Sequence, residues 1–285
     1  MSEGLRISVA KDAGFCFGVR DAIEKAREVA TEHGKVYMLG DIVHNERVVN
    51  DLAQENVKVV DSLDEVKGAP VLFRAHGTVP ELWEAATKKD LTIVDATCPL
   101  VHEIHDEIKK LHVENRKLII IGDHGHDEVV AIHAQVPDAK IVATIAEAEA
   151  LPRMKKAGVV SQSTQMIENV QEIIGILSMK IFDLRFVNTV CFPTRRNQAQ
   201  IKEIAPISDV MIIVGSFTSA NTKRLHEVSL SLNPRSYMVE SASDIQETWF
   251  DAAESVGVSA GASSPDDLIA EVVEHLKSLH VKERD

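Results

Sequence analysis

Three cysteines are the residues of this sequence whose type and spacing most clearly suggest chemistry. Cys16, Cys98 and Cys191 lie at nearly even intervals along the 285 residues, in the segments GFCFG, TCPL and VCFPT. Each follows a strand-like run and precedes a helix-like one, and a helix N-terminus favours a thiolate. An odd number of cysteines, in a chain that we expect in a reducing compartment, disfavours disulfides. Buried packing, a nucleophile and metal ligation remain as interpretations.

Among metals, zinc is usually bound by close cysteine pairs such as C-x-x-C, and the sequence contains no such pair. An iron–sulfur cluster, in contrast, accepts thiolates from distant loops. Three cysteines on a four-iron cluster would leave one iron without a protein ligand, where a substrate oxygen can bind. We therefore keep cluster binding as a hypothesis beside plain packing.

Three of the twelve histidines follow strand-like segments and precede helical ones, namely His44, His76 and His126. This position is where α/β folds gather ligands, and imidazoles there can donate hydrogen bonds to an anion. His102 and His105, on the helix after Cys98, are not predicted to bind anything. Glu128, two residues after His126, is the best candidate acid, although it also fits an ordinary first-turn glutamate.

Small hydroxyl residues end three further strand-like runs, in residues 161–164, 215–222 and 259–265. They are typical helix N-caps, and they also suit a phosphate, because hydroxyls and backbone N–H groups converge at a helix start. The sequence has no GxxxxGK[ST] loop, so a nucleoside triphosphate is not indicated.

The elements that must position these residues alternate between short apolar runs and helix-period stripes. We predict strands at residues 6–10, 35–39, 71–74, 91–94, 118–121, 158–161 and 210–214. Apolar stripes predict helices after Cys16, after Cys98, at 167–177 and at 268–276. The alternation predicts an α/β fold with mainly parallel sheets. One cysteine per unit suggests three similar units, at 1–97, 98–190 and 191–285, although their sequences are too dissimilar for a repeat to be assigned.

Charge and hydropathy narrow the partners. The formal net charge of −13 disfavours nucleic acid and acidic membranes, but a single pocket can still bind a small anion. No apolar run approaches the roughly 18–20 residues needed to span a bilayer, and the first residues do not resemble a signal peptide. We expect a cytoplasmic protein.

Nine segments, taken together and in order, resemble the 4-hydroxy-3-methylbut-2-enyl diphosphate reductase family of the methylerythritol phosphate route to isoprenoids. They are GFCFGVRDAI, DIVHNERVV, RAHGT, VDATCPLVHEIH, GHDEV, SQST, NTVCFPT, GSFTSANTKRL and GVSAGASSPDDLI. The resemblance implies three α/β units around a pseudo-threefold axis, with a central [4Fe–4S] cluster. It also implies the reductive dehydroxylation of a small diphosphate substrate to isopentenyl and dimethylallyl diphosphate, with electrons from a donor such as flavodoxin or ferredoxin.

The resemblance implies roles for individual residues as well. Cys16, Cys98 and Cys191 match the cluster ligands, and Glu128 with Ser163 matches the proton relay. The positions that match diphosphate contacts are His44, His76, His126, Ser219, Asn221 and Ser263.

The sequence departs from the family pattern around these positions. Asp123 stands where a histidine is usual, Asp127 where a proline is usual, and Ala220 where a serine is usual. Ser163 replaces a threonine, and Asn197 takes the place of an arginine. None of these changes removes a predicted cluster ligand or Glu128. We expect them to affect diphosphate affinity and proton transfer more than the type of reaction.

Three other functions use the same thiolates. A hydro-lyase with a three-cysteine cluster would need no external electrons. A non-enzymatic redox or iron sensor would need a specific partner, and a zinc-stabilised structural protein would contain zinc instead of iron. A requirement for a reductant and metal analysis separate these alternatives.

Overall fold

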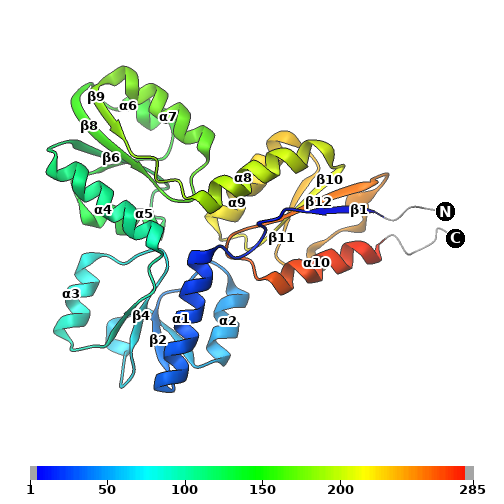
Figure 1. Cartoon of the computed structure of the whole chain (residues 1–285), viewed down its shortest axis with the longest axis horizontal. Coiled ribbons are helices and arrows are strands. Elements are labelled where there is room, and N and C mark those ends of the chain that lie inside the picture. Colours follow the sequence, from blue (N-terminus) through cyan, green and yellow to red (C-terminus); the bar gives the residue numbers. More distant parts are fainter. Residues whose placement is uncertain (1–4, 280–285) are drawn as a thin grey trace. The chain divides into compact units, whose positions relative to one another are not determined.

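The computed structural model describes residues 5–279, where helices alternate with the strands of three four-stranded sheets (Figure 1). All strand pairs in these sheets are parallel, which confirms the predicted α/β class and its three similar units. The chain forms two compact units. The terminal unit comprises the chain up to Phe17, His44–Val48 and the segment from Phe192 onward, and the central unit comprises Gly18–Val43 and Val49–Cys191.

The first sheet of the central unit has the strand order β3-β2-β4-β5. Its strands are β2 (Val36–Leu39), β3 (Val57–Val60), β4 (Val71–Phe73) and β5 (Ile93–Asp95). The associated helices are α1 (Phe17–His33), α2 (Glu46–Gln54) and α3 (Pro80–Lys88), with a 3-10 turn at Leu63–Glu65. Strand β4 is completely buried, and Phe73 packs edge-on against Trp83 of α3 at 4.8 Å between ring centroids.

The second sheet of the central unit has the equivalent order β7-β6-β8-β9. Its strands are β6 (Lys117–Ile121), β7 (Lys140–Val142), β8 (Met154–Ser161) and β9 (Ile181–Phe186). Its helices are α4 (Pro99–Val113), α5 (Asp127–Gln135), α6 (Ile145–Ala150) and α7 (Ile167–Lys180). Both faces of the sheet are covered, because one core cluster joins its strands to α6 and α7 and another joins them to α4 and α5.

The sheet of the terminal unit has the order β1-β12-β10-β11. Its strands are β1 (Arg6–Val9), β10 (Val210–Val214), β11 (Ser236–Val239) and β12 (Ser255–Ala260). Its helices are α8 (Phe192–Ile204), α9 (Ala220–Leu232) and α10 (Asp266–Ser278), with 3-10 turns at Ala205–Ile207, Ala242–Asp244 and Glu247–Phe250. A Cβ at Gly257 would lie 2.3 Å from Met211 Sδ and 2.6 Å from Ile204, so this glycine lets α8 approach the sheet.

Strand β1 pairs with a strand from near the other end of the chain. Residues 6–10 fall in the predicted first unit, 1–97, and β1 lies beside β12, as the blue and orange segments of Figure 1 show. The reason is geometric: the third sheet has an open edge beside β12, and the apolar residues Ile7 and Val9 extend it in parallel register with Val256 and Val258. The boundaries at 97/98 and 190/191 stay predictions.

The four helical stripes predicted from the sequence are confirmed by burial. Ala22, Ile23, Ala26 and Ala30 are buried on α1, and Val101, Ile104, Ile108 and Leu111 on α4. Val170, Ile173 and Leu177 are buried on α7, and Leu268, Ile269, Val272 and Leu276 on α10. No helix within residues 5–279 is both long enough and apolar enough to cross a membrane.

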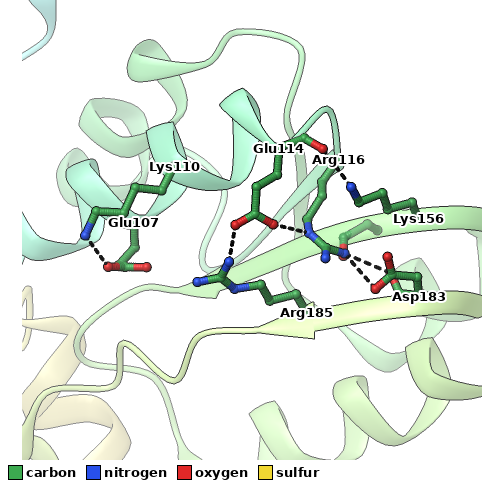
Figure 2. A network of polar contacts seen from close by, with 8 residues as sticks. Glu107, Lys110, Glu114, Arg116, Lys156, Asp183 and Arg185 are labelled. Atoms are coloured by element: carbon green, nitrogen blue, oxygen red, sulfur yellow. Dashed lines mark hydrogen bonds and ion pairs between the residues drawn. The ribbon is translucent and has the colours of Figure 1, made fainter.

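A polar network closes one end of the second central sheet, between the end of α4 and strands β8 and β9 (Figure 2). Arg116 donates to Glu114 at 2.7 Å and to Asp183 at 2.9 Å, and it also donates to the carbonyl of Ala157. Arg185 pairs with Glu114 from the neighbouring strand. The side chain of Arg116 is only 10% exposed, and its bonds link the end of α4 to strands β8 and β9.

The loops that carry the predicted histidine and serine residues leave the carboxyl ends of central strands. Each sheet has two adjacent central strands, which are β2 and β4, β6 and β8, or β10 and β12. One edge strand lies on the outer side of each central strand. Adjacent strands whose connections diverge leave a crevice at their carboxyl ends, which is where open α/β sheets bind ligands. The loops after β2, β6 and β10 contain His44, His126 and Ser219, and those after β4, β8 and β12 contain His76, Ser163 and Ser263.

Candidate active site

The three cysteines occupy equivalent places in the three sheets. Cys16 follows edge strand β1, Cys98 follows β5 and Cys191 follows β9, and each directly precedes a helix. The backbone N–H of each donates to a carbonyl in the loop after the neighbouring strand: Cys16 to Ala262 at 3.2 Å, Cys98 to Ala75 at 3.0 Å, and Cys191 to Ser163 at 2.9 Å. All three are half-buried and form no disulfide. The same local geometry therefore presents one thiol at the start of each of three helices, where a thiolate is stabilised.

Gly18 makes room for one of these sulfurs. A Cβ at Gly18, the second residue of α1, would lie 2.4 Å from Cys98 Sγ. Carbon and sulfur cannot approach so closely, so the thiol of Cys98 packs against a backbone that must lack a side chain. Gly18 also follows Cys16 by two residues in the sequence.

Glu128 lies in the central unit with Ser163 as its partner. Its side chain is 2% exposed and accepts two hydrogen bonds, from Ser163 N to Oε1 at 2.5 Å and from Ser163 Oγ to Oε2 at 2.7 Å. The first bond fixes the carboxyl on the loop after β8, and the second connects it to a hydroxyl that can both accept and donate a proton. The structure therefore brings together the two residues that the resemblance paired.

His126 is the N-cap of α5, and its Nδ1 accepts from the backbone N of Glu128 at 3.2 Å. This bond places the proton of the neutral ring on Nε2, which then is the ring's donor towards an anion. The rings of His76 and His126 meet edge to face, 5.8 Å apart between centroids. Two predicted diphosphate ligands of the central unit are thus neighbours.

The departures from the family pattern in this unit have partners. Asp127, where a proline is usual, accepts a hydrogen bond from Arg74 at 2.8 Å, and a ring nitrogen of His76 lies within 4.8 Å of its carboxylate. This ion pair joins the loop after β4 to the start of α5. The backbone N of Asp123 donates to Gln162 at 3.0 Å, and Gln165 lies 3.4 Å from its carboxylate.

His105, which was not predicted to bind anything, is buried on α4. It is 7% exposed, and its ring lies beneath Gly77, whose added Cβ would be 3.0 Å from Cε1. Its Nε2 has no hydrogen-bond partner among the described residues. Burial lowers the pKa of His105 to about 4, so the ring is neutral at pH 7 and supports the loop that carries His76. The signal available in the sequence was its position in line with Val101 and Ile108 on the apolar face of α4.

The terminal unit carries the predicted hydroxyl and amide ligands. Ser219 is the N-cap of α9 and accepts from Thr222 N at 3.3 Å. Asn221 Nδ2, Thr222 Oγ1 and Ser263 Oγ are buried and have no hydrogen-bond partner among the described residues. A buried donor without a partner costs roughly 1–3 kcal/mol, which a bound anion can offset. Thr222 lies in the segment 215–222, whose hydroxyl residues were predicted to suit a phosphate, but it was not singled out as a ligand.

His44 lies in the terminal unit beside Asn45, which organises the start of α2. Asn45 Oδ1 accepts from Val48 N at 3.3 Å, and its Nδ2 donates to the carbonyl of Ser263 at 2.8 Å. Arg47 then pairs with Asp267 and Glu271 of α10. The His44 segment is therefore held against the loop that carries Ser263. Asn197, in the arginine position of the family, is buried on α8, and Ala220, in the serine position, offers no side-chain donor at the start of α9.

The predicted residues thus form two groups, one in each unit. His76, Cys98, His126, Glu128, Ser163 and Cys191 belong to the central unit, and Cys16, His44, Ser219, Asn221 and Ser263 to the terminal unit. That the two groups act on one substrate stays a prediction. Three parallel sheets, each followed by one thiol and by polar side chains at the carboxyl ends of its strands, define the chain as an α/β protein with three similar sheets.

Comparison with known proteins gives the family. The model of the LytB protein family matches residues 7–277, so the chain belongs to that family. A 4-hydroxy-3-methylbut-2-enyl diphosphate reductase of Geobacter metallireducens is 39% identical over 276 residues, covering 96% of this chain and 98% of the relative. The reductase of Aquifex aeolicus is 37% identical, with 96% of each chain covered.

Two solved structures agree. The E-1-hydroxy-2-methyl-but-2-enyl-4-diphosphate reductase of Plasmodium falciparum aligns with a TM-score of 0.92 at 28% identity, over 95% of this chain and 88% of that one. A second structure, described as (E)-4-hydroxy-3-methyl-but-2-enyl diphosphate reductase, the terminal enzyme of the non-mevalonate pathway, aligns with a TM-score of 0.69 at 37% identity, over 96% and 99% of the chains. The resemblance stated from the nine sequence segments is confirmed.

Proposed function

We propose that this protein reduces 4-hydroxy-3-methylbut-2-enyl diphosphate to isopentenyl and dimethylallyl diphosphate. The allylic C–O bond breaks, two electrons and two protons enter, and one water leaves. The observation that carries the proposal is a buried carboxyl–hydroxyl pair, Glu128 and Ser163, in a chain that aligns almost end to end with reductases of this substrate. The pair would supply a proton, whereas the other predicted residues would donate hydrogen bonds to the diphosphate.

Cys16, Cys98 and Cys191 would hold a [4Fe–4S] cluster. Their fit rests on three half-buried thiols in equivalent loops, and on the space that Gly18 leaves beside Cys98 Sγ. When bound, the cluster supplies the electrons and an iron site for the substrate's allylic oxygen. Zinc fits less well, because a structural zinc site is usually closed by four protein ligands.

The residues that would bind the diphosphate are His44, His76, His126, Ser219, Asn221 and Ser263. In the terminal unit the support is the buried, unpartnered Nδ2 of Asn221 and Oγ of Ser263. In the central unit it is the Nε2 donor of His126, beside His76. Charge-assisted hydrogen bonds of this kind contribute about 1.5–3 kcal/mol each, so several of them hold the diphosphate and position the carbon chain.

Glu128 would be the proton source, acting through Ser163. When Glu128 is protonated, its acid O–H donates to Ser163 Oγ, and the hydroxyl passes its own proton to the substrate side. Ser163 N continues to hold Oε1, so the carboxyl keeps its position while its charge changes. The serine in place of the family's threonine retains the hydroxyl and loses only a methyl group.

The test begins with anaerobically purified protein, which should contain iron and sulfide near four each per chain. Turnover should require a reductant such as dithionite, whereas a hydro-lyase would work without one. Glu128→Gln should lower turnover by about 10²–10⁴-fold with the cluster retained, because the amide keeps the size but has no acid proton. Ser163→Ala should also lower turnover with the cluster retained.

Glu172→Gln is the matched control, since Glu172 is an exposed glutamate of α7 and the substitution removes the same charge. It should leave turnover unchanged. A Glu128→Gln enzyme with wild-type rate would end the assignment of the proton source. Iron-free protein with zinc in its place would end the reductase proposal.

A further inference from the structure

Helix α8 presents a regular face to solvent. Its exposed residues are Phe192, Arg195, Arg196, Ala199, Lys202 and Glu203, and its buried ones are Thr194, Asn197, Gln198 and Ile201. Both sets recur every three to four residues, so each forms one side of the helix. The exposed side begins with an aromatic residue and continues with three cations.

This face is basic in an acidic protein. Helix α8 carries three cations against the single anion Glu203, whereas the whole chain has a net charge of −13. No other α-helix in the range 5–279 has as large a positive balance. Arg195 forms no ion pair with any described residue, and neither does Lys11, which is exposed in the loop after β1. Asp12 pairs with Arg196 and so joins that loop to α8.

An aromatic pair lies at the start of the same face. Phe17 and Phe192 stack with their centroids 5.5 Å apart and their planes 7° from parallel. Phe192 is 43% exposed. Phe17 directly follows Cys16, and Phe192 directly follows Cys191, so the pair adjoins two of the proposed cluster ligands in the sequence. Exposed aromatic and arginine side chains together are typical of the centre of protein interfaces.

We propose that Phe17, Phe192, Arg195, Lys11 and the exposed cations of α8 form a docking surface for an acidic one-electron carrier protein. This inference rests on the proposed function, because that reaction consumes two electrons. A carrier that gives one electron at a time must dock twice per turnover and leave quickly. Complementary charge raises the association rate without requiring a large interface, and electron-transfer encounters typically have small ones. A partner that recognised bulk charge alone would instead be repelled by the net charge of the chain.

The experiment compares two electron sources on the anaerobic holoenzyme with equal iron content. One is a reduced [2Fe–2S] ferredoxin of acidic composition, and the other is dithionite with methyl viologen. Arg195→Glu should lower kcat/KM for the ferredoxin about tenfold or more, and Arg195→Gln should lower it less. Both variants should keep viologen-driven turnover within about twofold of wild type. Raising the salt concentration should slow wild-type turnover with ferredoxin more than turnover of Arg195→Glu.

Arg153→Glu is the matched control, because Arg153 is also exposed and forms no ion pair with any described residue. It lies before β8, at the end of the sheet away from Ser163. The docking surface is refuted if Arg195→Glu and Arg153→Glu change the ferredoxin reaction equally, or if Arg195→Glu slows both electron sources alike. If wild-type enzyme fails to reduce the diphosphate even with viologen, the proposed function itself fails, and the docking surface falls with it.

Discussion

Gly18→Ala tests the cysteine site through one added methyl group. In a helix, alanine is normally preferred over glycine by about 0.5–1 kcal/mol, and Gly18 does not adopt a positive φ that would exclude alanine. Local propensity therefore predicts a slightly more stable protein. The contact with Cys98 predicts the opposite for the metal centre.

The size of the effect follows from one distance. The new Cβ would lie 2.4 Å from Cys98 Sγ, whereas non-bonded atoms of this size normally stay about 3.5 Å or more apart. The sulfur, the helix or both must move by about 1 Å. Metal–ligand distances tolerate deviations of only about 0.2 Å, so a displaced thiolate cannot keep its place on a cluster.

The assay is iron and sulfide content per chain after anaerobic purification, together with the thermal unfolding temperature. Gly18→Ala should lose at least half of its iron and show correspondingly less turnover, while the polypeptide still folds. Gly175→Ala is the matched control, because Gly175 lies inside α7 and an added Cβ meets nothing within 4 Å. It should keep all its iron and become more stable by about 0.5–1 kcal/mol.

Full iron content in Gly18→Ala, at a wild-type rate, would refute the reasoning. It would mean that Cys98 Sγ is not constrained at this position, or that it is not a ligand. Loss of iron in both glycine variants would point to a general loss of stability and would equally remove the argument from the contact.

Two further predictions concern groups away from the substrate. The pKa of buried His105 is lowered from 6.5 to about 4, so its contribution to folding stability is fully present above pH 6.5 and is lost as the pH falls towards 4, by about 3 kcal/mol in all. In His105→Leu the unfolding temperature should therefore change less between pH 7 and pH 5 than in the wild type. An unchanged pH dependence would show that another group titrates. Hydrogen bonding from Arg116 lowers the pKa of Glu114 below its ordinary value of 4.5. The stability that this pair contributes to the fold is therefore present above pH 4.5 and is lost in acid. Arg116→Met should lower the urea midpoint of unfolding at pH 7 without changing the m-value, and should lower it less at pH 3.

The sequence predicted the parts of the fold that are set by local pattern. Strands such as β10, with five buried apolar residues in a row, and helices with a complete apolar stripe were found at or near their observed bounds. The edge strands β3, β7, β9 and β11 were missed. All four contain polar positions, and β3, β7 and β11 are only three or four residues long. β12 was missed for another reason. It is a buried central strand, but its sequence contains Gly257 and two serines and so does not read as an apolar run. The placement of β1 beside β12 depends on contacts between the two ends of the chain, which no local pattern contains.

For the site, the sequence supplied the residue types and the structure supplied the partners. The histidines, cysteines and Glu128 were recognisable by their place after strand-like runs and by the family resemblance. The hydrogen bonds of Ser163 to Glu128, the contact of Gly18 with Cys98 and the pairing of Arg74 with Asp127 join residues 35 or more positions apart. Such contacts follow from sheet order and not from spacing.

The structure also reveals a short repeat that the whole-chain comparison of units could not. The loops after β2 and β6 read GDIVHNE and GDHGHDE, and the loop after β10 has GSFTSAN at the same positions. His44, His126 and Ser219 are thus equivalent, as are Glu46, Glu128 and Asn221. Glu46 is exposed, however, whereas Glu128 is 2% exposed.

What distinguishes the copies is the residue whose carbonyl accepts from the cysteine N–H: Ala75, Ser163 and Ala262. Of the three residues, only Ser163, in the loop after β8, offers a side-chain hydroxyl, and it donates to Glu128 of the repeat copy after β6 at 2.7 Å. A loop that occurs three times is therefore joined to a hydroxyl in one copy, through two residues that the other copies do not combine. The proposed role of Glu128 depends on its partner on the neighbouring loop and not on the motif that carries it.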